Sequence, residues 1–201
     1  DLDGVRGNVR SMETNQGNLM ADGLLWQANE LASQFGVKES DIALQNGGGI
    51  RNDEVVPAGN ITELKTFDMA PFSNFVTVIE DIPASQFKEI MENCASQVEN
   101  VSGRFGQVAG FRVVYDTSRT AQVLDNDGIV QTPGDRVDTL ILNDGTVIVE
   151  GGLIPAGAPD VTIATINFLA NGGDNYPFRG ADFTQLGVTY QQSLANYLSE
   201  S

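Results

Sequence analysis

Three consecutive glycines at positions 47–49 constrain the fold of this 201-residue sequence more than any other feature. They follow an apolar run that ends at Leu44, and Arg51 comes shortly after them. Each glycine loses much conformational freedom on folding, so three fixed glycines imply a backbone geometry or a close approach that side chains would forbid. Backbone N–H groups in such a turn, with a guanidinium beside them, predict an anion cradle. The alternative is a tight turn with a surface arginine.

The net charge and the absence of histidine limit the classes of function that this chain can have. Eleven Lys and Arg stand against 27 Asp and Glu, a net charge of −16, which argues against nucleic acid or an anionic membrane as partner. An anionic ligand must therefore meet a local arginine. With no histidine, the chain lacks the common general base and the common zinc ligand. The lone Cys94 lies in an apolar helical pattern and is interpreted as a core residue, not a nucleophile.

The length and the 41% apolar content fit a single domain over residues 1–201. The sequence contains no run of eighteen apolar residues, so it predicts no transmembrane helix. Its first residues do not resemble a signal peptide. Because the chain starts without Met and already within a pattern, we interpret it as a fragment or a processed product.

Apolar periodicity and turn residues predict a mixed α+β layered domain. Asn15 or Asn18 is the expected cap of the first long helix, and Gly36 is its expected end. Asp144-Gly145 predicts the turn of a hairpin. The expected helices cover residues 19–35 after that cap, 62–67, 83–98 and 188–198. The expected strands cover 41–44, 75–79, 111–115, 136–142, 146–149 and 161–166, and residues 117–133 are interpreted as a surface excursion.

A second Asn/Gly loop, residues 167–176, follows the last expected strand and could converge with the first on one pocket. Two aromatic rings belong to the expected loops: Phe72, which follows Pro71, and Tyr176. Two such rings facing each other would hold a planar group at about 1–3 kcal/mol per stacked base. The alternative is that each ring caps the edge of the core.

Five sequence blocks together resemble the C-terminal substrate-binding domain of the 5′-nucleotidase / UDP-sugar hydrolase family. They are residues 9–19, 46–51, 71–72, 105–116 and 168–176, and they run in the family's order over nearly the whole chain. Five ordered blocks are far more specific than one glycine loop.

The resemblance implies a division of labour. In the family, an N-terminal metallophosphoesterase domain carries two divalent metal ions and performs the hydrolysis, and this chain has no counterpart of that domain. The chain itself would need no cofactor, would be inactive alone and would bind the nucleoside part of a nucleotide or UDP-sugar. The expected partners are this ligand and the N-terminal domain of the same protein. The expected location is periplasmic or extracellular.

Matched residue by residue, the family's base site falls on the two Asn/Gly loops and the Pro71 turn. Phe72 and Tyr176 would stack the base, and Asn46 and Gly49 would hydrogen-bond its edge, with Gly48 in the same substrate-binding set. Tyrosine stands at position 176 where the family more often has phenylalanine, which preserves stacking.

The residues matched to phosphate and ribose contacts lie farther apart in the sequence. Arg51 would meet the phosphate, and Arg10 matches an entrance arginine that helps to hold phosphate in some members. Asp182 lies near the place of a ribose-hydroxyl acceptor. Asn175 replaces a common glycine, so the substrate choice stays open.

Two other functions remain open from the residues. The strong acidity fits an extracellular interaction module that keeps the fold without binding a ligand. An independent phosphatase with a carboxylate-only metal site is the third possibility.

Overall fold

The computed structural model describes residues 1–200. Its centre is a five-stranded mixed sheet with the strand order β12-β4-β11-β2-β5, and a three-stranded sheet, β10-β9-β6, lies beside it. Two short strand pairs, β1-β3 and β7-β8, are also present. The strands are β1 (Leu2–Asp3), β2 (Ile42–Asn46), β3 (Val55–Val56), β4 (Phe75–Ile82), β5 (Gly106–Ala109), β6 (Phe111–Tyr115), β7 (Val123–Leu124), β8 (Val130–Thr132), β9 (Val137–Leu142), β10 (Val147–Val149), β11 (Val161–Ile166) and β12 (Thr184–Thr189).

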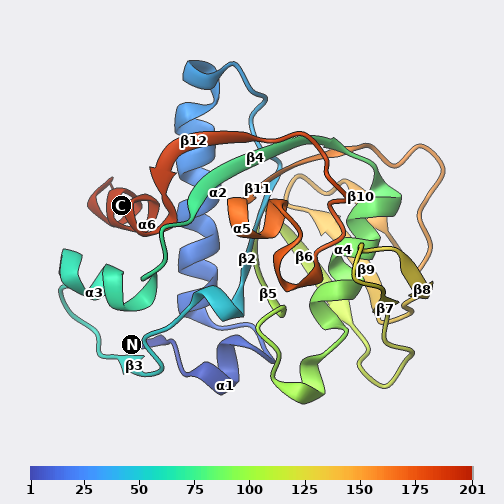
Figure 1. The fold of residues 1–201 in the computed structure, drawn as a ribbon, viewed down its shortest axis with the longest axis horizontal. Helices are drawn as coiled ribbons and strands as arrows, with labels where there is room; N and C mark the ends of the chain where they lie inside the picture. The colour runs from blue at the N-terminus through green and yellow to red at the C-terminus, as the bar shows by residue number, and fades with distance from the viewer. Residues whose placement is uncertain (201) are drawn as a thin grey trace.

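Helices cover both faces of the large sheet. Figure 1 shows α2 and α6 on one side of it, and α4 with the small sheet on the other. Adjacent residues of β5 mark this division, because a Cβ at Gly106 would meet Cys94 of α4 at 2.8 Å, whereas Gln107 lies against Gly17 of α2. The helices are α1 (Arg6–Val9), α2 (Asn15–Phe35), α3 (Glu63–Met69), α4 (Ala84–Ala95), α5 (Asn167–Ala170) and α6 (Tyr190–Glu200), with 3₁₀ turns at Gly47–Gly49, Val98–Asn100 and Gly173–Asn175. The predicted α+β layered class is confirmed.

The two inner strands β2 and β11 are buried at every position. Their continuous burial is typical of strands covered on both faces. They run parallel, with Ile163 opposite Ile42, whereas β4 runs antiparallel to β11, with Ile166 opposite Val76. The ends of β2 and β11 and the start of β4 therefore share one edge of the sheet. This edge carries the glycine turn, the second Asn/Gly loop and the Pro71 turn.

The long helix α2 begins one residue earlier than its expected cap allows. The Thr14 hydroxyl accepts a hydrogen bond from the Gly17 N–H at 3.0 Å, and Thr14 has extended backbone angles. A cap at Asn15 or Asn18 is therefore wrong, since both residues lie inside the helix. The expected end at Gly36 is confirmed. Gly36 has a φ of 67°, the left-handed geometry that glycine commonly adopts at the end of a helix.

The hairpin around Asp144-Gly145 is confirmed as β9 and β10, with Gly145 at a φ of 94°. Two expectations need correction. The surface excursion at 117–133 contains the β7-β8 hairpin, and the start of the expected helix at 188–198 belongs to β12. β12 pairs with β4 at the outer edge of the large sheet.

Candidate functional site

A cavity of about 550 Å³ opens at the shared edge of β2, β4 and β11. Its volume lies within the range of small-molecule sites. It is lined by Arg10, Asn46, Gly48, Gly49, Arg51, Phe72, Ser73, Asn74, Gly103, Phe168 and Asp174. We call it the loop cavity.

Hydrogen bonds between the loops fix the walls of the loop cavity. Asn46, the last residue of β2, donates from Nδ2 to Oδ2 of Asp174, so the two Asn/Gly loops do converge as expected. The Phe75 N–H donates to Oδ1 of Asn167 at 2.9 Å, which ties the start of β4 to the start of α5. The cavity is thus built on three strand ends of a rigid sheet.

The glycine turn serves close packing, and the N–H groups of two of its glycines are bonded to backbone carbonyls. The Gly47 N–H donates to the Phe105 carbonyl at 2.7 Å, and the Gly48 N–H donates to the Gly103 carbonyl at 2.8 Å. A Cβ at Gly47 would lie 2.1 Å from the Val9 carbonyl oxygen. The predicted N–H cradle is therefore wrong for these two glycines, because both donors are already used.

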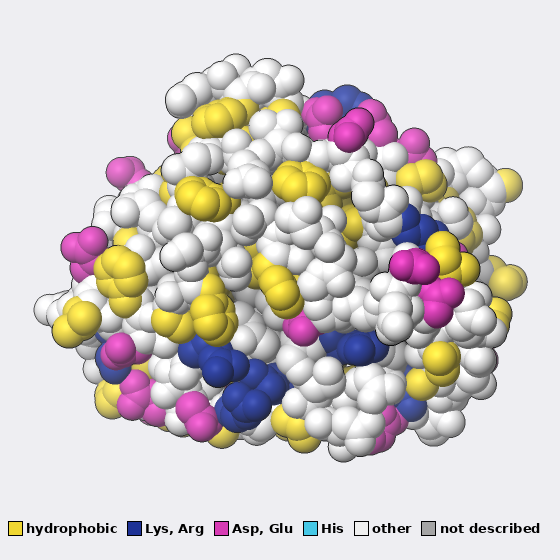
Figure 2. Space-filling model, in the orientation of Figure 1, with side chains coloured by type: hydrophobic (Ala, Val, Ile, Leu, Met, Phe, Trp, Pro, Cys, Tyr) yellow, Lys and Arg dark blue, Asp and Glu magenta, His cyan; other side chains and the backbone are white. Residues whose placement is uncertain are grey.

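Two arginines bring positive charge to the loop cavity. Arg10, at the end of α1, is only 8% exposed, and its Nε has no hydrogen-bond partner among the described residues. Burial lowers the pKa of Arg10, and the neighbouring Arg6 and Arg51 lower it further. Within residues 1–200, neither Arg10 nor Arg51 forms an ion pair with a carboxylate. Figure 2 shows basic side chains gathered over α1 on this face.

Two phenylalanine rings line the loop cavity while remaining partly open to solvent. Phe72 is 44% exposed and Phe168 is 43% exposed. The guanidinium carbon of Arg51 lies 5.5 Å from the centroid of the Phe72 ring. The Phe168 ring rests on Gly173, where a Cβ would lie 2.5 Å from its Cζ. Leaving this much aromatic surface in contact with water is unfavourable. The two exposed rings are accessible to a planar ligand, which could cover them.

The structure does not bring Tyr176 to Phe72, so the expectation that these rings face each other is wrong. Tyr176 is only 2% exposed, and its hydroxyl donates to the Arg104 carbonyl at 2.7 Å and lies 3.2 Å from the Cys94 sulfur. The two residues before it have φ angles of 52° and 60°, a left-handed geometry that turns the chain toward the core. Phe168, and not Tyr176, lines the loop cavity together with Phe72.

Asp182 also lies away from the loop cavity. It is exposed and lines a separate cavity of about 750 Å³, together with Tyr176 and the turn between β7 and β8. Arg179, the cation of that cavity, is paired with Glu89. Of the predicted site residues, the loop cavity therefore contains Arg10, Asn46, Gly48, Gly49, Arg51 and Phe72, and lacks Tyr176 and Asp182.

Sequence reasoning missed Phe168 and Asp174. Both belong to the second Asn/Gly loop, and Phe168 follows β11 by two residues. Its place next to the end of a buried strand was the available signal, because ligands bind at the carboxyl ends of parallel strands.

The described residues bring together no group of three or more His, Cys, Asp or Glu side chains able to hold a metal ion. No helix within residues 1–200 is both long enough and apolar enough to cross a membrane.

Comparison with known sequences identifies relatives that share this architecture. A family model described as the 5′-nucleotidase C-terminal domain matches residues 2–180. The trifunctional nucleotide phosphoesterase YfkN of Bacillus subtilis is 36% identical over 87% of this chain and 10% of its own length. The human 5′-nucleotidase is 30% identical over 87% of this chain and 28% of its own length. UshA of Escherichia coli is 28% identical over 88% of this chain and 25% of its own length.

Comparison with solved structures finds the same fold in related proteins. The crystal structure of a 5′-nucleotidase precursor from Thermus thermophilus superposes with a TM-score of 0.78 at 33% identity, covering 99% of this chain and 35% of that one. The NAD nucleotidase of Haemophilus influenzae shares the fold, with a TM-score of 0.62 at 17% identity over 91% of this chain and 29% of that one. The chain spans between about a tenth and about a third of the length of each relative named here. It belongs to the family of 5′-nucleotidase C-terminal domains.

Proposed function

We propose that the chain is the nucleotide-recognition domain of a 5′-nucleotidase-type phosphohydrolase and that the loop cavity is its ligand site. One observation carries the proposal: the cavity combines two arginines that have no ion-pair partner within residues 1–200 with two half-exposed phenylalanine rings. A nucleotide offers a matching pair of features, an anionic phosphate and a planar base.

The arginines are assigned to the phosphate. The protein carries a net charge of −16, so its overall field repels an anion. Arg10 and Arg51 offset this locally, because both line the cavity and neither is neutralised by an ion pair within residues 1–200. Guanidinium groups bind phosphate oxygens through charge-assisted hydrogen bonds, often in pairs.

The base is assigned to the space bordered by Phe72 and Phe168, with Asn46, Gly48 and Gly49 at its edge. In the free protein, Arg51 lies over the Phe72 ring at 5.5 Å. A stacked base would compete with this contact or lie on the other face of the ring. Stacking contributes about 1–3 kcal/mol per base.

The whole protein is proposed to contain an N-terminal metallophosphoesterase domain beside this one. The two divalent ions that the family resemblance implies for that domain would supply the hydrolytic chemistry. This chain's part is to bind the nucleoside, so that the binding energy positions the phosphate for reaction. The likeness to a snake venom 5′-nucleotidase, 28% identical over 87% of this chain, supports a secreted or periplasmic protein.

Calorimetric titration of the folded chain at low salt with nucleoside monophosphates, nucleosides, UDP-sugars and inorganic phosphate tests this proposal. We expect monophosphates to bind more tightly than their nucleosides and Phe72→Ala to weaken both. The absence of heat with every ligand up to about 1 mM would overturn a competent site and favour the acidic interaction module instead.

A further inference from the structure

One side-chain hydrogen bond joins the two Asn/Gly loops. Asn46 Nδ2 donates to Asp174 Oδ2 at 2.5 Å across 128 positions of sequence. At the other end of the same amide, Gln45 Nε2 donates to Asn46 Oδ1 at 2.9 Å. A flipped amide would set two NH₂ groups together and its oxygen against a carboxylate. These two neighbours therefore allow a single orientation of the Asn46 amide.

The surrounding residues hold this arrangement in place. Gln45 is fully buried, and a Cβ at Gly49 would lie 2.3 Å from its Nε2, so the glycine makes room for it. Asp174 has a φ of 52°, a left-handed geometry that costs about 1 kcal/mol or more in a residue other than glycine. Its carbonyl accepts a hydrogen bond from the buried Asn93 side chain at 3.3 Å. Such strain persists only where the neighbours over-determine the backbone.

The clamped amide still has bonding capacity toward the cavity. Asn46 and Asp174 both line the loop cavity. An amide has two N–H groups and two acceptor lone pairs, and the two neighbours use one of each. The remaining N–H and lone pair are then held at fixed positions in the wall of the loop cavity. A base whose donor and acceptor positions match them binds better than one whose positions are reversed.

We propose that Asp174 is a positioning residue that sets base selectivity by holding the Asn46 amide in one orientation. The inference rests on the proposed function, because it requires Asn46 to lie at the edge of a bound base. Asp174 acts through Asn46 and needs no contact with the ligand.

Adenosine and inosine are the probes that test this inference. They have the same size and stacking surface, but adenosine has an amino donor at position 6 and an acceptor at N1, whereas inosine has a carbonyl and an N1–H. In the wild-type chain we expect their dissociation constants to differ about fivefold. In Asp174→Ala only Gln45 still favours one orientation of the Asn46 amide, so the ratio should fall toward one. Asp174→Asn keeps an acceptor oxygen for Asn46 and should restore the ratio.

A structural role alone would weaken both nucleosides equally and leave their ratio unchanged, and that result would overturn the inference. Equal affinities in the wild-type chain would also overturn it. If the wild-type chain binds neither nucleoside, the proposed function itself fails.

A double variant keeps the test decisive if Asp174→Ala does not fold. Asn46→Asp combined with Asp174→Asn preserves the net charge and the contact between the loops but exchanges donor and acceptor. Urea unfolding monitors its stability. A carboxylate at position 46 accepts hydrogen bonds but has no N–H to donate to a base, so we expect the preference of the wild-type chain to change. An unchanged preference would contradict the proposed role.

Discussion

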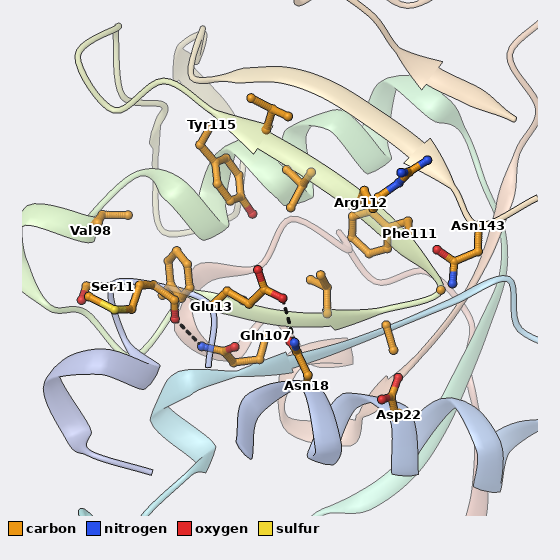
Figure 3. A pocket seen from close by; sticks show the side chains of 18 of the residues that line it. Ser11, Glu13, Asn18, Asp22, Val98, Gln107, Phe111, Arg112, Tyr115 and Asn143 are labelled. Carbon is orange, nitrogen blue, oxygen red and sulfur yellow. Dashed lines mark hydrogen bonds between the residues drawn. The ribbon is translucent and has the colours of Figure 1, made fainter. Parts of the chain in front are cut away.

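Two cavities of similar size lie on different parts of the large sheet. The loop cavity occupies the edge where β2 and β11 end, whereas a cavity of about 630 Å³ lies between α2, β5 and β6. Figure 3 shows the second one, where Glu13 is hydrogen-bonded to Asn18 and the Asp22 side chain rises from α2. Its cation, Arg112, extends away from these carboxylates.

The difference between the two cavities lies in charge and in the state of the rings. The larger one has two carboxylates, and its rings at Phe105 and Phe111 are only 6% and 5% exposed. The loop cavity has one carboxylate, Asp174, and two arginines that form no ion pair within residues 1–200, and its rings are about half exposed. Cavity volume alone would not select the loop cavity. Charge and exposed aromatic surface are the features on which we propose it as the nucleotide site.

The largest expected effect tests the contrast in charge. Arg10→Met removes a buried cation while keeping an apolar stem, so we expect nucleoside monophosphate affinity to fall by about 10- to 100-fold, in line with a charge-assisted hydrogen bond. Nucleoside affinity should change little. Calorimetry measures both.

The matched control for Arg10→Met is Arg112→Met, an exposed arginine of the other cavity. It should leave nucleotide binding within about twofold of the wild type. A larger loss with Arg112→Met than with Arg10→Met would place the phosphate in the cavity between α2 and β6.

The next effect tests which ring stacks the base. Phe168→Ala should weaken nucleosides and nucleotides alike by about 1–3 kcal/mol, because the stacking surface is lost. Tyr176→Phe removes only the buried hydroxyl that bonds to Arg104, so it should keep the affinity and lower the stability of the fold by about 1 kcal/mol. Calorimetry and urea unfolding separate the two effects. An unchanged affinity in a folded Phe168→Ala variant would contradict stacking of the base on Phe168.

The smallest effect concerns the carboxylates of the second cavity. Desolvation raises the pKa of Asp22, although the residue as a whole is exposed. The folded state therefore disfavours the charged form, so stability is greatest below the unfolded pKa and is lost as pH rises through the folded one. Asp22→Asn removes this penalty and should stabilise the chain at pH 7 by less than about 0.5 kcal/mol, given solvent screening.

Urea midpoints at pH 7 and near pH 3.5 check the Asp22→Asn prediction. The advantage of the variant should shrink at the lower pH, where the wild-type carboxyl is mostly protonated in both states. An advantage that is equal at both pH values would show that the carboxylate charge does not cause it.

Much of the frame of the loop cavity follows from sequence pattern. The apolar runs before the glycine turn and before residue 167 predicted strands, and Pro71 predicted that Phe72 lies outside the ladder. The interpretation of Cys94 as a core residue is confirmed by its complete burial. Local signals of this kind depend on burial and on turn chemistry, which the chain encodes over a few residues.

The side chains that complete the cavity were harder to predict. Tyr176 turns inward because Asp174 and Asn175 adopt positive φ angles, which residues other than glycine take only when tertiary contacts enforce them. The N–H groups of the glycine turn are used by carbonyls at Gly103 and Phe105, more than fifty positions away in sequence. Long-range contacts decide both outcomes, and a single sequence does not display them.

A crystal structure of the chain with a bound nucleoside monophosphate tests the central claim most directly. The account predicts the base between Phe72 and Phe168, with its edge at Asn46 and its phosphate within hydrogen-bonding distance of Arg10 or Arg51. A base bound beside Tyr176 and Asp182, or in the cavity between α2 and β6, would contradict it.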